Sequence, residues 1–278
     1  MLVEAERIAA TVILGIHGRK RAGPGESFWQ YRPYSFGDST QRIDWHKSAR
    51  ADRVFIRENE WEAANALWLW CSPGPGMNFQ SHLAKVTKRD RAQLLALALA
   101  VLAIDAQERV AAIGAPFAAG HARSQLIRMA DHFTARSGDS LPETARLPRF
   151  ASVALLGDFL DPIETIAKAL APLASSGAKG HIVQICDPAE ETLPYTGRTE
   201  FRAMLGPERF LAGKAESLRE AYIAKFTAHR QALRTLAGRF GWTFSLHRTD
   251  ASPTAALMML HGLIGGEKSR LFGARRGA

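Results

Sequence analysis

The sequence predicts a doubly wound α/β fold with a mostly parallel central sheet. Two observations indicate this fold: the segments of strand length are almost entirely apolar, and they alternate along the chain with segments of helical periodicity. Strands that are apolar on both faces are typical of a parallel sheet that helices cover on both sides. The apolar fraction of 46% is ordinary for a globular protein, and 278 residues suffice for one large domain with an extension.

The regular pattern begins near residue 61. The predicted strands, in chain order, span residues 66–71, 109–114, 152–156, 181–186 and 242–247. The predicted helices span residues 88–107, 124–134, 163–175, 216–240 and 253–264. Together these elements predict a main domain over residues 61–264.

The two ends of the chain and one inner segment lack such periodicity. Residues 1–60 are rich in Gly, Arg and aromatic residues, and we expect them to form a β-rich extension of loops and short strands. Residues 265–278 are rich in Gly and Arg and are expected to be a flexible tail. Residues 187–211 are predicted to be irregular, and a connection of this length often carries function.

Composition limits the classes of protein and the location. The formal net charge of +9 suits an acidic protein partner, a nucleic acid or an anionic membrane surface, and equally a solvated basic surface without such a role. Cys71 and Cys186 lie in apolar runs, which predicts buried thiols and no disulfide. The acidic start is unlike a signal peptide, and no apolar run reaches the roughly 20 residues that a membrane span needs, so a cytoplasmic protein is expected.

Candidate functional residues follow the predicted strands. In a doubly wound sheet, ligands bind beyond the carboxyl ends of the strands. This rule selects the loops 72–77, 157–161 and 187–191 as a partner-binding surface or metal site. Its candidate residues are Ser72, Gly74, Gly76, Met77, Asp158, Asp161, Asp187 and Glu190.

A dense polar motif lies before the main domain, in Phe36-Gly-Asp-Ser-Thr-Gln-Arg-Ile-Asp-Trp-His-Lys-Ser-Ala-Arg50. It resembles the signature of the domain of unknown function 58 family, and the segment 187–194 with Gly197 and Arg198 also fits that family. The matching signature residues are Gly37, Asp38, Arg42, Asp44, Trp45, Ser48 and Arg50. Among them, Asp38, Arg42, Asp44, Trp45 and Arg50 form a docking surface, a catalytic constellation or, as we favour, an internal network of ion pairs and hydrogen bonds that holds the N-terminal piece to the sheet.

The resemblance implies a von Willebrand A-like main domain and a partnership with MoxR-type AAA+ ATPases, and it implies no particular reaction. Domains of this fold often hold a divalent cation with an Asp-x-Ser-x-Ser motif after the first strand. The matching stretch here is Ser72-Pro-Gly-Pro-Gly76, which lacks the carboxylate and two hydroxyls. Because Mg²⁺ requires oxygen ligands, we expect a degenerate metal-ion-dependent adhesion site and no cofactor, with weak Mg²⁺ binding through Asp158 left open.

Other motifs favour simpler interpretations. The histidines show no metal-binding spacing and no Ser/His/Asp set is apparent, which argues against a catalytic triad. The glycines of 73–76 alternate with prolines that lack the N–H groups a phosphate loop needs, so a tight turn is favoured. Basic runs at 19–21 and at Lys85, Lys88, Arg89 and Arg91 leave nucleic-acid binding open.

The sequence therefore predicts a non-enzymatic interaction scaffold or adaptor that works with a MoxR-type AAA+ ATPase in the maturation or assembly of a client complex. Two alternatives remain. One is a metal-dependent hydrolase that uses Asp158, Asp187 and Glu190, and the other is a nucleic-acid-binding protein with a basic surface.

Overall fold

A computed structural model of the chain describes residues 1–17, 31–33, 55–57, 66–143, 147–148, 151–204 and 206–274. The chain forms two compact units, one of Met1–Gly18 with Asn65–Ala278 and the other of Arg19–Ala64. In the smaller unit, strands β1 (Tyr31–Pro33) and β2 (Phe55–Arg57) pair in antiparallel fashion. The larger unit contains the candidate site.

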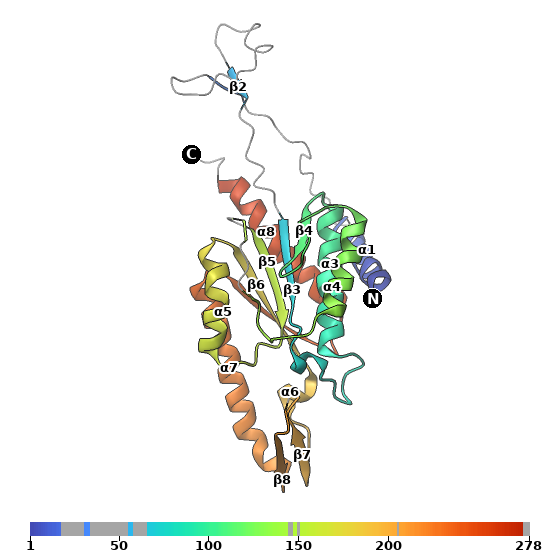
Figure 1. Cartoon of the computed structure of the whole chain (residues 1–278), viewed down its shortest axis with the longest axis vertical. Coiled ribbons are helices and arrows are strands. Elements are labelled where there is room, and N and C mark those ends of the chain that lie inside the picture. Colours follow the sequence, from blue (N-terminus) through green and yellow to red (C-terminus); the bar gives the residue numbers. More distant parts are fainter. Residues whose placement is uncertain are drawn as a thin grey trace. The chain divides into compact units, whose positions relative to one another are not determined.

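A five-stranded sheet forms the centre of the larger unit (Figure 1). Its strands lie in the order β4 (Arg109–Ala112), β3 (Ala66–Cys71), β5 (Ser152–Gly157), β6 (Lys179–Cys186) and β9 (Thr243–Arg248). All four neighbouring pairs are parallel, which confirms the predicted doubly wound α/β class. The chain runs outward from β3 to β4 and then crosses back to β5, so the topological switch point lies between β3 and β5.

Each central strand contributes side chains to two separate cores, one on each face of the sheet. In β3, Leu67, Leu69 and Cys71 face the first core, whereas Trp70 faces the second. Helices α3 (Lys88–Asp105), α4 (Arg123–Ala135) and α8 (Pro253–Ala274) cover the first face. Helices α5 (Ile163–Ser175) and α7 (Arg219–Arg239) cover the second face. The apolar character of the strands thus reflects burial on both sides.

The start of the chain differs from the sequence-based expectation of loops and short strands. Residues Leu2–His17 form helix α1, which packs against α3 and α8. Its buried residues Ala5, Ile8, Ala9 and Val12 follow the spacing of one helical face. The Gly- and Arg-rich composition of residues 18–60 masked this short periodic segment. Helix α1 also explains why α3 is apolar nearly all round, since α3 is covered by the sheet on one side and by helices on the others.

Two further segments are more regular than predicted. Within 187–211 the chain forms helix α6 (Pro188–Thr192) and a hairpin of β7 (Thr199–Arg202) and β8 (Arg209–Ala212), followed by the 3-10 helix η3 (Ala215–Leu218). Helix α8 continues through its glycines to Ala274 instead of ending at Ile264.

Both cysteines are buried and free, as predicted, and burial raises the pKa of each thiol. Over the described part of the chain, no helix combines the length and the apolar character needed to cross a bilayer.

Candidate functional site

The loops that follow β3, β5 and β6 meet at the first turn of α3, around Lys88. The Lys88 side chain is only 1% exposed, and its Nζ lies 3.2 Å from Asp158 Oδ2 and 2.5 Å from Glu190 Oε1. We call Lys88, Asp158 and Glu190 the charge cluster. The structure therefore brings together two of the acidic residues predicted from the strand ends. It adds a lysine that the sequence interpretation had assigned to a basic run.

Burial and charge act in opposite directions within this cluster. Burial by itself would lower the pKa of the Lys88 ammonium, but the Glu190 and Asp158 carboxylates together hold that pKa above its ordinary value. Burial raises the pKa of Glu190, and the Lys88 charge and hydrogen bonds oppose this rise. Removal of Lys88 would leave two carboxylates inside the protein without a counter-ion, and an uncompensated buried charge typically costs about 3–5 kcal/mol.

Asp187 lies beside this cluster, and each of its carboxylate oxygens accepts a backbone hydrogen bond. Its Oδ1 accepts a hydrogen bond from Ala189 N, and its Oδ2 accepts one from Ser81 N, each at 2.9 Å. Glu190 Oε2 in turn accepts from Asp187 N at 2.8 Å, which completes a capping box on α6. The sequence Asp-Pro-Ala-Glu accounts for this local structure, since it supplies the N-cap, a proline in the first turn and the returning glutamate.

The loop after β3 is closely packed, which explains its residue types. Ser72 Oγ donates to Ser140 O at 2.9 Å and accepts from Gly74 N at 3.3 Å. A Cβ atom at Gly74 would lie 2.8 Å from Ser140 Cα, and one at Gly76 would lie 2.5 Å from Asp158 Oδ2. The two glycines at the positions of the expected serines therefore leave no room for a side chain.

The remaining predicted residues of these loops have structural roles. The 3-10 helix η2 (Pro75–Asn78) carries Met77, whose side chain is fully buried in the first core. Asp161 Oδ2 accepts a hydrogen bond from Ser140 Oγ at 2.6 Å, and so ties the loop after β5 to the one that covers Gly74.

The basic run at the start of α3 turns inward. Arg89 Nη2 donates to Pro73 O at 2.7 Å, and Arg91 donates to Thr249 O and Ala251 O at 2.7 and 3.0 Å. With Lys88, these residues connect α3 to the loops that follow β3, β5, β6 and β9. Of the four basic residues assigned to this run, only Lys85 is exposed.

An aromatic surface adjoins the charge cluster, and we define it as Tyr195, Phe201, Phe210, Tyr222 and Phe226. Ring centroids lie 5.7 Å apart for Tyr195 and Phe201, 6.3 Å for Phe201 and Phe210, and 5.8 Å for Tyr222 and Phe226. Burial raises the pKa of Tyr195, and the nearby Asp187 and Glu190 charges raise it further. Burial also raises the pKa of Tyr222, with smaller contributions from Glu190 and Tyr195. The rings thus extend from the hairpin to α7 beside the charge cluster.

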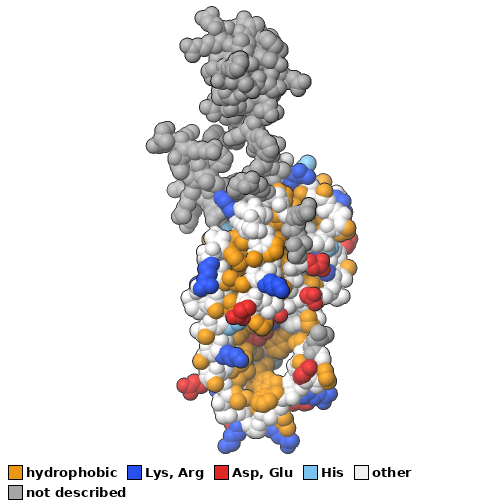
Figure 2. Space-filling model, turned by 60° about the vertical axis from the view of Figure 1, so that its left-hand side comes forward, with side chains coloured by type: hydrophobic (Ala, Val, Ile, Leu, Met, Phe, Trp, Pro, Cys, Tyr) orange, Lys and Arg blue, Asp and Glu red, His pale blue; other side chains and the backbone are white. Residues whose placement is uncertain are grey.

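Part of this region is open to solvent. Phe210 on β8 is 55% exposed, and hydrophobic side chains gather in a hollow in the lower part of Figure 2. The sequence interpretation missed this surface, since it treated 187–211 as irregular. The signal available in the sequence was the i, i+4 spacing of Tyr222 and Phe226 within the predicted helix 216–240, whereas Tyr195, Phe201 and Phe210 follow no helix or strand period.

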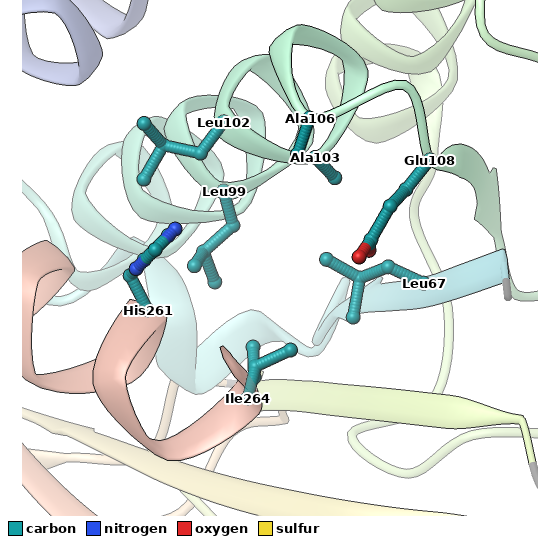
Figure 3. A pocket seen from close by; sticks show the side chains of 8 residues that line it. All are labelled: Leu67, Leu99, Leu102, Ala103, Ala106, Glu108, His261 and Ile264. Atoms are coloured by element: carbon teal, nitrogen blue, oxygen red, sulfur yellow. The ribbon is translucent and has the colours of Figure 1, made fainter. Parts of the chain in front are cut away.

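A small pocket lies elsewhere, between α3, α8 and the start of β3 (Figure 3). Its volume is about 40 Å³, and it is lined mainly by aliphatic side chains together with Glu108 and His261. It includes none of the predicted site residues. The signature residues 37–50 lie outside the described residues, so their role stays a prediction.

Comparison with known proteins gives a family but no activity. The family model described as "Protein of unknown function DUF58" matches residues 30–232. The relatives include uncharacterized protein Rv1480 of Mycobacterium tuberculosis and uncharacterized protein Mb1516 of Mycobacterium bovis. Each is 26% identical over an alignment of 263 residues, and the match covers 86% of this chain and 80% of the relative. Because the family match extends over more than half of the sequence, the chain belongs to the DUF58 family of proteins of unknown function.

Proposed function

We propose that this chain is a cytoplasmic protein-interaction module of the von Willebrand A-like kind with a degenerate cation site. Its partner in this proposal is a MoxR-type AAA+ ATPase, with which it acts in the maturation or assembly of a client complex. The observation that best supports a binding role is the aromatic surface, which lies beside the loops at the carboxyl edge of the sheet. This edge is where doubly wound folds bind their ligands.

Two features make the aromatic surface suitable for a protein partner. Aromatic residues contribute much of the binding energy at protein interfaces, and contiguous exposed apolar patches often mark such interfaces. Arg202 and Arg209 of the same hairpin do not belong to this surface, because strand alternation directs them to the opposite face, where both pair with Glu200.

The alternative functions have less support. A hydrolase needs a carboxylate that can reach water or substrate, but Asp158 and Glu190 are ion-paired with Lys88, and both oxygens of Asp187 accept backbone hydrogen bonds. A nucleic-acid surface along the basic run of α3 is also disfavoured, because Lys88, Arg89 and Arg91 bind internal carboxylates and carbonyls.

The experiment is a binding assay with the purified MoxR-type ATPase of the same cells, in the presence and absence of EDTA. Phe210→Asp places a charge on the aromatic surface, and we expect it to weaken binding by about tenfold or more, as for a central interface residue. Ile127→Asp on α4 is the matched control, because Ile127 is 52% exposed and lies outside the aromatic surface. Binding by the wild type that EDTA abolishes, or no binding at all, would contradict the proposal.

A further inference from the structure

The position of Lys88 bears on whether the carboxyl edge of the sheet can hold a metal ion. We propose that the Lys88 ammonium takes the place of a divalent cation and serves as a permanent internal cation that joins the loops after β5 and β6. The inference deepens the proposed function and rests on it only for the location of the cation site. It does not depend on the identity of the partner.

The geometry of the charge cluster supports this assignment. Lys88 Nζ contacts Asp158, which follows β5, and Glu190, which follows β6, and so it connects two loops that are far apart in the sequence. A divalent cation at the carboxyl edge of this sheet would bind the same kinds of oxygen ligands. The ammonium carries a positive charge to this position, fills the space and is itself buried. A second cation beside it would meet both repulsion and occupied ligands.

Three other oxygen atoms of these loops already have hydrogen-bond partners. Ser72 Oγ donates to Ser140 O, and the Asp187 oxygens accept from Ser81 N and Ala189 N. At residue 76, a serine Cβ would lie 2.5 Å from Asp158 Oδ2 and would displace the carboxylate from Lys88. The residues present therefore fit a buried lysine and do not fit a divalent cation.

This arrangement has a consequence for recognition. In a metal-dependent site, a partner carboxylate completes the coordination of the exposed ion. Lys88 is 1% exposed and already holds two carboxylates, so a partner cannot bind it directly. Recognition must therefore use the outer surface of the loops and the neighbouring rings. The conformation of the loops is expected to be the same with and without divalent ions.

The test measures thermal unfolding and Mn²⁺ titration calorimetry on the full chain, comparing the wild type with two variants. Lys88→Ala removes the ammonium and leaves space beside the carboxylates of Asp158 and Glu190. Lys88→Met fills most of that space with an apolar side chain. We expect both variants to be destabilised, because each leaves two carboxylates without their counter-ion. Millimolar Mn²⁺ should raise the melting temperature of Lys88→Ala alone by several degrees, whereas Na⁺ at equal ionic strength should not.

Two outcomes would overturn the proposal. One is a stabilisation of the wild type by Mn²⁺, reversed by EDTA, because a metal would then bind in the presence of the lysine. The other is a response to Mn²⁺ that is equal in Lys88→Ala and Lys88→Met. If Lys88→Ala does not fold, the wild-type measurement alone still decides. Failure of the Lys88 proposal would leave the Phe210→Asp result unaffected, because that variant changes a different surface.

Discussion

At the scale of single residues, the charge cluster depends on close packing as well as on charge. Gly76→Ala would place a Cβ atom 2.5 Å from Asp158 Oδ2, and that carboxylate cannot move freely because Lys88 holds it inside the protein. We expect a loss of about 1–3 kcal/mol in the free energy of unfolding, the usual cost of overpacking a core, measured by urea denaturation. Gly213→Ala is the control, since its Cβ would meet nothing within 4 Å. Equal free energies of unfolding for Gly76→Ala and Gly213→Ala would show that Lys88 does not fix the position of the Asp158 carboxylate.

A second residue-scale prediction concerns pH. Burial, reinforced by the Arg91 guanidinium, lowers the pKa of His247 to about 4, and Asp250 opposes this only in part. The unfolded chain binds this proton near pH 6.5, whereas the folded chain binds it only near pH 4. The contribution of neutral His247 to the free energy of unfolding is therefore fully present above pH 6.5. About 3 kcal/mol of it is lost as the pH falls toward 4.

His247→Gln, which does not titrate, should therefore lose less stability than the wild type between pH 6.5 and 4 when both are unfolded by urea at each pH. The exposed His82→Gln variant should follow the wild type. If the free energies of unfolding of His247→Gln and the wild type fell in parallel with decreasing pH, this would contradict the lowered pKa of His247.

At the scale of elements, local patterns predicted most of the fold. The predicted strands at 66–71 and 152–156 and the predicted helix at 163–175 agree with β3, β5 and α5, because apolar runs and turn residues are visible within each segment. Helix α1 and the β7–β8 hairpin were missed. Each lies next to a segment rich in turn residues, and a composition averaged over the longer segment hides its period.

The candidate site was predictable only in part for a related reason. The rule about strand ends selected Asp158, Asp187 and Glu190, which do lie around one position. The counter-ion of Asp158 and Glu190 is Lys88 in the first turn of α3, which is separated from Asp158 by 70 residues and from Glu190 by 102. The sequence Lys88-Arg-Asp-Arg91 reads as a solvated basic run. Only the tertiary structure shows that Lys88 and Arg91 are buried.

At the scale of the whole molecule, helix α1 joins the start of the chain to a domain that otherwise begins at residue 65. Its buried face packs on α3, the same helix whose first turn organises the candidate site. Ile8 is 3% exposed on this face, whereas Leu14 on the same helix is 74% exposed. Ile8→Ala should therefore lower the free energy of unfolding by about 2–4 kcal/mol, while Leu14→Ala should change it by less than about 0.5 kcal/mol.

Urea denaturation, followed both by far-UV circular dichroism and by tryptophan fluorescence, would check this expectation. In a background in which Trp29, Trp45 and Trp61 of the smaller unit are replaced by Phe, the remaining tryptophans, Trp68, Trp70 and Trp242, lie in or against the second core. This core is on the opposite face of the sheet from α1, so fluorescence then reports on a region that Ile8 does not touch. If α1 is an integral part of the larger unit, Ile8→Ala should shift both transitions together to lower urea concentration. A shift in the helical signal alone would mean that α1 unfolds separately, and that α3 and the loops it holds are stable without this covering helix.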